Sequence, residues 1–462
     1  MSEGIVARGI EKVRKLLGER ETDGGLSARK LAQVQEQLKE CVAGAGGEIS
    51  ARQRAVRLAE TYLGLGDAGR LAFLRLIATE FGPDPKAVAR AHEKYQAAIG
   101  NDEQWAAESA LRAAMRSSRL RILTQFNAMP QGVKFLVDLR ADLLRLQEKD
   151  PALRALDREL ETRLSAWFDV GFLELQRISW NSPAGLLEKL IEYEAVHEIR
   201  SWSDLKNRLD SDRRCYAFFH PRMPMEPLIF VEVALVEELA DNVQALLDEK
   251  APVFDAQRAK TAIFYSISNT QVGLRGVSFG NFLLKRVVED LKRDFPRLTT
   301  FATLSPIPGL RRWLDKNPEL WDQVFNKEML VRVARHAAEL GAAIESAEDV
   351  RKLLASNEWA AQPRLVRALQ PGLTRLAAKY FLTAKSGDRP VDPVSRFHLG
   401  NGARIERINY FADTSENGLK QSYGLMVNYL YDPDSIEKNV EAFSREGTVV
   451  TSGAVRRAAR DD

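Results

Sequence analysis

Two residues of this 462-residue chain, Ser305 and His398, are of types that serve in hydrogen bonding and proton transfer, and each lies next to a strand-like segment. Ser305 closes the β-branched run Leu298–Leu304 and opens a rigid Ser-Pro-Ile-Pro stretch. His398 shortly precedes the strand-like segment Arg404–Phe411. Taken singly, Ser305 is also typical of a turn and His398 of a structural, hydrogen-bonded residue. The elements that position them therefore decide between these readings.

The segment Ala262–Pro308 contains the clearest such arrangement. An apolar run, Ile263–Ile267, precedes the glycine-containing loop Asn269–Gly280, and helical periodicity follows over Asn281–Phe295. The run that ends at Ser305 completes a strand, loop, helix, strand unit. Two strands joined through a helix are most simply parallel neighbours, and open α/β sheets bind ligands at the carboxyl ends of such strands. The pattern predicts a ligand site that the loop and Ser305 share.

The loop itself is typical of an anion site, because glycines and a following helix N-terminus present backbone N–H groups. It lacks the Gly-Lys-Ser/Thr of a nucleotide P-loop. It resembles the loop that holds the pyrophosphate of acyl-coenzyme A in the GNAT acyltransferase superfamily, although Ser278 replaces the second glycine. The alternative is a glycine-rich turn that only packs a helix against a sheet. The candidate phosphate-loop residues are Arg275, Gly276, Val277, Ser278, Phe279 and Gly280.

Composition excludes several classes of protein. The 67 basic and 64 acidic residues leave a net charge of +3, too small an excess to predict nucleic-acid binding. Cys41 and Cys215 are too few for a disulfide framework, and the five histidines show no metalloprotease spacing, so we expect no metal. With no membrane span and no signal sequence in view, the chain is predicted to be cytoplasmic, with a mitochondrial-matrix origin as a weaker alternative.

The periodicity predicts an α+β protein of two domains. Residues 1–169 have the pattern of an all-α bundle, expected to serve assembly. Residues 170–462 have that of a mixed α/β catalytic domain with a helical insertion at about 317–382. After the insertion, strand patterns resume at Arg404–Phe411 and Gln421–Tyr431, and Gly447–Asp462 is expected to be a frayed tail.

As a whole, the chain resembles the malonyl-CoA decarboxylase family. The resemblance is carried by five blocks, spread in order from Phe218 to Asp432. They are FFHPRMPMEPLIFVEVAL, SISNTQVGLRGVSFGNFLLKRVV, FATLSPIPGLRRWL, RPVDPVSRFHLGNGARIERINYFAD and GLMVNYLYD. It implies a helical oligomerisation domain followed by a GNAT-like catalytic domain, assembled as a homotetramer that acts on malonyl-CoA in fatty acid metabolism.

The resemblance also implies roles for particular residues. The family's catalytic serine and histidine match Ser305 and His398, and an active-site tyrosine matches Tyr431. Asn401 is a weaker candidate for the same network. Ser278 stands where animal members of the family are expected to carry an acidic residue, which removes a carboxylate from this position.

Decarboxylation of malonyl-CoA needs hydrogen-bond donors for the enolate that forms, and a proton for its carbon. Ser305 is expected to donate to the carboxylate or the enolate oxygen, and His398 to orient the carboxylate and protonate the carbanion, helped by a charge state that changes near neutral pH. No separate cofactor is expected, because the thioester accepts the electrons and coenzyme A enters with the substrate. Two alternatives remain: an acyltransferase that uses an amine acceptor, and a non-catalytic acyl-CoA-binding protein.

Overall fold

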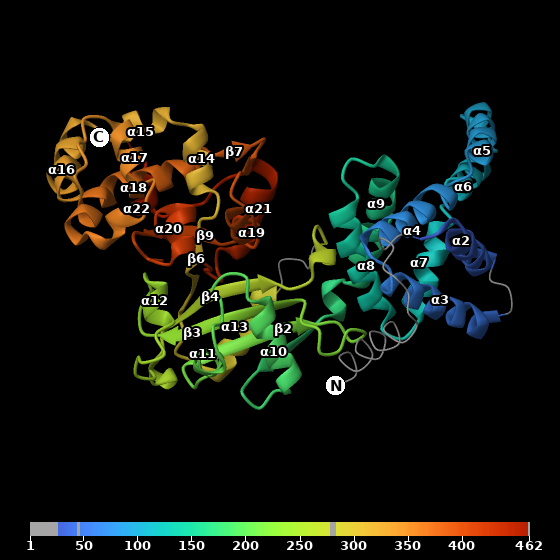
Figure 1. Ribbon diagram of the computed structural model, residues 1–462, viewed down its shortest axis with the longest axis horizontal. Helices are drawn as coiled ribbons and strands as arrows, with labels where there is room; N and C mark the ends of the chain where they lie inside the picture. Colours follow the sequence, from blue (N-terminus) through green and yellow to red (C-terminus); the bar gives the residue numbers. More distant parts are fainter. Residues whose placement is uncertain (1–25, 44–46, 278–282, 461–462) are drawn as a thin grey trace. The chain divides into compact units, whose positions relative to one another are not determined.

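The computed structural model describes residues 26–43, 47–277 and 283–460, and it divides the chain into two compact units (Figure 1). One unit holds Met1–Asp169 together with Gln271–Ser278, and the other holds Val170–Thr270 and Phe279–Asp462. We call them the helical unit and the α/β unit. The predicted fold class, an all-α region followed by a mixed α/β region, is confirmed.

The helical unit is built from amphipathic helices, most of which bury an apolar face. Two of these helices begin in the same way: Pro85 and Pro151 each occupy the first turn, and the preceding Asp84 and Asp150 accept hydrogen bonds from backbone N–H groups. The described helices are α2 (Ala28–Ala43), α3 (Gly47–Leu63), α4 (Asp67–Glu80), α5 (Pro85–Ala98), α6 (Gln104–Ala114), α7 (Arg119–Ala128), α8 (Gly132–Leu146) and α9 (Pro151–Trp167).

The α/β unit is organised around a sheet in the order β1-β2-β3-β4-β5-β10-β6, with β9 also paired to β10. Its neighbours are antiparallel except for β4 and β5, which are parallel as predicted. The strands are β1 (Glu174–Ile178), β2 (Arg213–Phe219), β3 (Ile229–Val236), β4 (Thr261–Asn269), β5 (Thr300–Thr303), β6 (Ser305–Pro306), β9 (Arg404–Asn409) and β10 (Met426–Leu430).

Strands β4 and β5 pair only as far as Phe264 and Thr303. The register of β4 against β3 shifts at this point, so that Tyr265 is an extra residue, a β-bulge. Beyond it, Ser305 pairs with Val427 of β10 instead of with β4. The sheet therefore opens between β4 and β6, next to Ser305.

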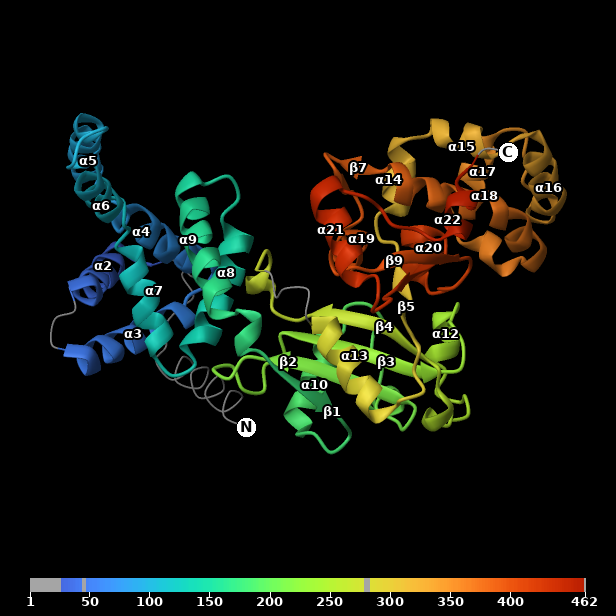
Figure 2. The ribbon, with the colours of Figure 1, turned by 180° about the vertical axis from the view of Figure 1, so that it is seen from behind.

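Helices cover both faces of this sheet. Cys215 and Ala217 of β2 pack with α10 (Ala184–Tyr193), whereas the alternate residue Tyr216 hydrogen-bonds to Asp290 of α13 (Leu283–Asp294). Figure 2 shows both helices beside the sheet. Because side chains alternate along a strand, α10 and α13 lie on opposite faces. The short helix α12 (Val243–Leu246) packs on Ala234 of β3, on the same face as α10.

A run of helices separates β6 from the later strands: α14 (Leu310–Lys316), α15 (Glu319–Val324), α16 (Lys327–Ala337), α17 (Ala347–Leu353) and α18 (Pro363–Thr383). Helix α11 (Trp202–Arg208) follows α10, and α19 (Pro393–Gly400), α20 (Glu416–Ser422), α21 (Ile436–Glu446) and α22 (Gly453–Ala458) complete the unit. Among the described residues, no helix combines the length and the apolar character that crossing a bilayer requires.

Two local predictions are wrong. The strand predicted from Gln421 begins only at Met426, because α20 extends to Ser422 and ends in left-handed backbone at Tyr423. The carboxyl-terminal segment, expected to fray, instead forms α22, whose Val455 is buried. Thr451, just before α22, forms a β-bridge with Ile405 of β9, which holds this segment in place.

Candidate active site

Three residues that are distant in sequence meet in the α/β unit. Ser305 begins β6, His398 lies in the last turn of α19, and Tyr431 follows β10. The Oγ of Ser305 lies 3.3 Å from Nε2 of His398, and Nδ1 of His398 lies 2.7 Å from the Tyr431 hydroxyl. All three side chains are buried. The structure thus brings the three predicted catalytic residues into one hydrogen-bonded chain.

Helix α19 is held in place at its first residue. Asp392 caps it by accepting a hydrogen bond from Ser395 N at 2.8 Å, and Pro393 occupies the first turn. The Tyr380 hydroxyl donates to the same carboxylate at 3.1 Å. Burial raises the pKa of Asp392, although its hydrogen bonds oppose this. The cap sets the position from which α19 delivers His398.

The imidazole ring is fixed from its face as well as its edges. Tyr429 stacks on it, with ring centroids 4.4 Å apart and planes inclined by 23°. The Tyr429 hydroxyl is in turn 2.8 Å from Ser395 Oγ on the same helix. Tyr429 is a positioning residue that the sequence reasoning missed, and no local pattern distinguishes it from other apolar strand residues.

Burial makes His398 neutral in this structure. It lowers the pKa of the ring to about 3, because the charged form would lose its hydration. The prediction that His398 changes charge near neutral pH is therefore wrong for the unliganded protein. Sequence alone does not reveal how deeply a histidine is buried, which is what decides its charge.

The hydrogen-bond directions follow from these protonation states. Ser305 donates its own hydrogen to Thr303, so its oxygen accepts the hydrogen of the neutral ring from Nε2. Nδ1 then carries no hydrogen and accepts from the Tyr431 hydroxyl, which stays protonated because burial raises the pKa of the phenol well above its usual value. The single hydrogen of the neutral ring then lies on Nε2 and faces Ser305. Ser305 donates onward to Thr303 Oγ1 at 2.8 Å. In this structure the Nε2–H of His398 thus donates to Ser305 Oγ, and the Ser305 hydroxyl donates to Thr303.

A cavity of about 230 Å³ adjoins this cluster on the α13 face of the sheet. Tyr431 and Asn401 line it from one side, and Leu284, Lys285 and Val288 of α13 line it from another. Asn401 donates to the Phe397 carbonyl at 2.6 Å, so its amide caps the end of α19 while it faces the cavity. The cavity gives a small substrate group a route to Tyr431.

The described part of the candidate phosphate loop belongs to the helical unit. Its Gly273, in the 3-10 turn Val272–Leu274, lies so close to α8 that a Cβ atom would come 1.8 Å from the Val137 carbonyl oxygen. Gly276 has a φ of +87° and faces Glu161. At Gly273, the glycine thus serves close packing. Ser278, Phe279 and Gly280 lie outside the described residues.

Arg140 of α8 holds the loop from the protein interior. Its Nη1 donates to the carbonyl oxygens of Gly273 at 2.9 Å and Arg275 at 2.7 Å. Asp157 and Glu161 of α9 balance its charge, with N···O distances of 2.8 and 3.2 Å. Only 2% of Arg140 is exposed. The buried guanidinium of Arg140 therefore fixes the backbone around Arg275.

Within residues 26–43, 47–277 and 283–460, no three His, Cys, Asp or Glu side chains converge in an arrangement suited to a metal ion. A helical unit, a mixed sheet and a buried Ser–His–Tyr cluster beside a cavity define a two-unit enzyme of the α+β class. The comparisons with known proteins give this class a family.

The family model described as the malonyl-CoA decarboxylase C-terminal domain matches residues 171–462, and that of the N-terminal domain matches residues 81–168. A mitochondrial malonyl-CoA decarboxylase of Anser anser anser is 37% identical over 410 residues, 85% of this chain and 80% of that protein. The crystal structure of malonyl-CoA decarboxylase from Rhodopseudomonas palustris is 42% identical, with a TM-score of 0.81 over 94% of this chain and 100% of that one. The structure from Agrobacterium vitis is 40% identical, with a TM-score of 0.81 over 93% of this chain and 100% of that one. This chain belongs to the malonyl-CoA decarboxylase family.

Proposed function

We propose that this protein is a carboxy-lyase that converts malonyl-CoA to acetyl-CoA and CO2. The observation that carries the proposal is the Ser305–His398–Tyr431 chain, buried beside a cavity in a member of this family. The reaction takes up one proton: the malonyl C–C bond breaks, CO2 leaves, and the electron pair passes to the thioester carbonyl before the methylene carbon is protonated.

In this proposal Ser305 and the Nε2–H of His398 bind the malonyl carboxylate and then the developing enolate oxygen. To do so, the Ser305 hydroxyl exchanges Thr303 Oγ1 for a substrate oxygen, and the Nε2–H exchanges Ser305 Oγ for another. Both donors are then aimed at the developing charge. Tyr431 acts on the substrate indirectly. Its hydroxyl donates to Nδ1 of His398 and so keeps the ring hydrogen on Nε2, where it can donate to the substrate. The thioester is the electron sink, so we propose no separate cofactor.

The proton reaches His398 with the substrate. An arriving carboxylate favours the charged form of a neighbouring imidazole and opposes the burial that holds the ring neutral. The ring then takes up a proton, pairs with the carboxylate, and gives that proton to the carbanion after CO2 has left. One proton is bound and one is consumed in each turnover, so the atoms and charges balance.

We further propose that residues 275–280 bind the pyrophosphate of coenzyme A. Arg140 supports this role because it fixes the backbone of Arg275 through the carbonyl oxygen, while the side chain of Arg275 stays exposed on the surface of the loop. Binding energy from this remote part of the substrate would position the small malonyl group.

Arg140→Lys tests the loop. Lysine keeps the positive charge but has a single nitrogen, so it cannot hold the two carbonyl oxygens and also pair with Asp157 and Glu161, and the loop should lose its fixed shape. We expect KM for malonyl-CoA to rise roughly tenfold with kcat little changed, as for a loss of uniform binding. Arg145→Lys on the same helix, where the arginine is half exposed, is the matched control. An unchanged KM in Arg140→Lys would remove the loop from substrate binding.

The reaction itself is tested with purified protein and carboxyl-labelled malonyl-CoA, with no added amine, nucleotide or metal. We expect labelled CO2 and acetyl-CoA to appear in equal amounts. Malonyl-CoA that binds and stays intact would favour a binding protein instead. Turnover that depends on an added amine would favour acyl transfer.

We propose a homotetramer assembled through the helical unit. In support, α6 buries none of its residues, and Trp105 on that helix is 76% exposed, with Ile99 and Met115 exposed at its two flanks. Large exposed apolar side chains that gather on one element commonly mark a contact between proteins. The cytoplasmic setting and a place in fatty acid metabolism belong to the same proposal, although the animal relatives are named as mitochondrial proteins.

Trp105→Glu tests this assembly. A charge at Trp105 should oppose the burial of this helix between subunits, so we expect light scattering to show a species smaller than the wild-type assembly. Trp180→Glu, at an exposed tryptophan of the α/β unit, is the control and should leave the mass unchanged. An unchanged mass in Trp105→Glu would place the interface elsewhere.

A further inference from the structure

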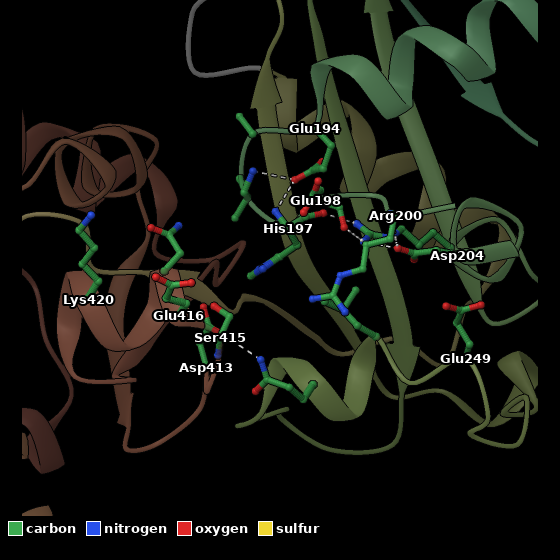
Figure 3. Close-up of a pocket in the computed structure, with 16 residues that line it drawn as sticks. Glu194, His197, Glu198, Arg200, Asp204, Glu249, Asp413, Ser415, Glu416 and Lys420 are labelled. Carbon is green, nitrogen blue, oxygen red and sulfur yellow. Dashed lines mark hydrogen bonds and ion pairs between the residues drawn. The ribbon is translucent and has the colours of Figure 1, made fainter. Parts of the chain in front are cut away.

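A second, larger cavity of about 710 Å³ lies in the α/β unit, on the face of the sheet opposite α13, since its lining residue Arg208 pairs with Glu232, which faces α10. Figure 3 shows the side chains that line it. The segment Glu194–Arg200 and helices α11 and α12 form one side. The segment 413–420, which follows β9, forms the other. It shares no lining residue with the cavity at the Ser305 cluster, so the proposed reaction does not account for it.

The walls of this cavity are acidic. Three basic side chains, Arg200, Arg208 and Lys420, face six carboxylates: Glu194, Glu198, Asp204, Glu249, Asp413 and Glu416. The charge of Arg208 is already balanced, because it pairs with Asp204 at 2.8 Å and with Glu232, which does not line the cavity, at 3.1 Å. A bound cation would therefore meet a surplus of negative charge.

Two acceptor atoms of residues that line the cavity have no donor among the described residues. His197 is 8% exposed, yet its Nε2 has no hydrogen-bond partner. The backbone of Tyr265, the bulge residue of β4, binds the ring, and burial lowers the pKa of His197 to about 4, which keeps it neutral. Asp413 accepts from Gln244 at 2.9 Å and from Ser415 N at 3.0 Å, both at Oδ1. Its Oδ2 accepts no hydrogen bond from the described residues.

These two atoms specify the chemistry of a ligand. An unprotonated imidazole nitrogen and a carboxylate oxygen both accept hydrogen bonds, so the group between them must donate. Asp413 is a charged neighbour of His197, which favours a cation there. His197 and Asp413 supply two such atoms, fewer than the roughly three or four protein ligands of a typical metal site, whereas an organic ammonium needs only hydrogen-bond acceptors. A primary ammonium has three N–H donors and one positive charge.

We propose that this cavity is a binding site for a linear diamine or polyamine. One terminal ammonium donates to His197 Nε2 and Asp413 Oδ2. The carboxylates at the exposed rim, Glu198, Glu249 and Glu416, receive the second cationic group, and the size of the cavity admits the aliphatic chain between them. The site is distinct from the proposed catalytic cluster and does not rest on its chemistry.

The test is calorimetric titration of the full-length protein with putrescine and, separately, with 1,4-butanediol, which has the same chain length without charge. We expect putrescine to bind and the diol not to bind. Failure of putrescine to bind, or equal binding of both compounds, would overturn the proposal. This comparison needs no variant and stands even where a substitution disturbs folding.

Two variants locate the site. Asp413→Asn keeps an oxygen for Gln244 and Ser415 but turns an N–H donor toward the cavity. His197→Asn keeps a short polar side chain near the Tyr265 backbone and deletes Nε2. Each should weaken putrescine binding about tenfold or more, as for the loss of a hydrogen bond to a charged group. Glu237→Gln, at an exposed carboxylate outside the cavity, should bind as wild type does. Wild-type affinity in both folded variants, judged by thermal unfolding, would contradict the proposed site.

Discussion

Replacing His398 with alanine should lower the turnover of malonyl-CoA by roughly 10² to 10⁴-fold, the range typical of a lost acid–base group. The ring connects Ser305 with Tyr431, at 3.3 and 2.7 Å, and alanine removes both the N–H that meets the carboxylate and the proton that the carbanion needs. Because the handle of the substrate binds elsewhere in our proposal, KM should change far less than kcat. Steady-state kinetics of CO2 release measures both.

Two comparisons separate this chemical effect from damage to the fold. His92→Ala, at an exposed histidine of the helical unit, should retain wild-type turnover. Tyr431→Phe keeps the aromatic packing against Phe264 but no longer selects the ring nitrogen that carries the hydrogen, so it should lower kcat less than His398→Ala does. Turnover of a folded His398→Ala protein at the wild-type rate would exclude the ring from the reaction.

Mild acid should destabilise the wild-type protein more than a His398→Gln variant. In an unfolded chain the imidazole pKa is about 6.5, whereas burial lowers the pKa of His398 to about 3 in the fold. Between these pH values the unfolded state binds a proton that the folded state excludes. The free energy of unfolding therefore falls as the pH is lowered from 6.5 toward 3, by up to about 1.4 kcal/mol per pH unit.

Urea denaturation at pH 7.5 and pH 5.0 measures this difference. We expect the wild type to lose about 2 kcal/mol more than His398→Gln between these conditions. Other buried groups also titrate: burial lowers the pKa of His197 and raises that of Glu232. Both are present in the two proteins, so their contributions cancel in the comparison. Equal losses would mean that the ring is hydrated in the folded protein.

Local patterns in the sequence predicted the local elements well. The unit from Ala262 to Pro308 follows from short-range periodicity, and the structure confirms β4, α13 and the parallel β5. Apolar spacing and turn residues act over a few positions, which is why they can be recognised in one sequence. The packing role of Gly273 could not be predicted from the loop itself, because it depends on α8, a helix more than a hundred positions earlier.

The site depends on contacts that no local pattern contains. Ser305 and His398 are 93 positions apart, and several helices intervene between them. The resemblance to a family named the pair, but neither the stacking of Tyr429 nor the neutral state of the ring follows from residue types. Both are properties of packing: one requires strand β10 to lie against α19, and the other requires the exclusion of water from the ring.

Because His398 is neutral in the free enzyme, the apparent affinity for malonyl-CoA should depend on pH. When the ring must gain a proton as the malonyl group arrives, the complex that forms holds one more proton than its separated components. By mass action, alkaline conditions should then weaken apparent affinity by up to about tenfold per pH unit, while the rate of the fully occupied enzyme stays level. A change in pH would therefore alter the substrate concentration at which the enzyme is half saturated. A higher concentration of malonyl-CoA would restore the maximal rate.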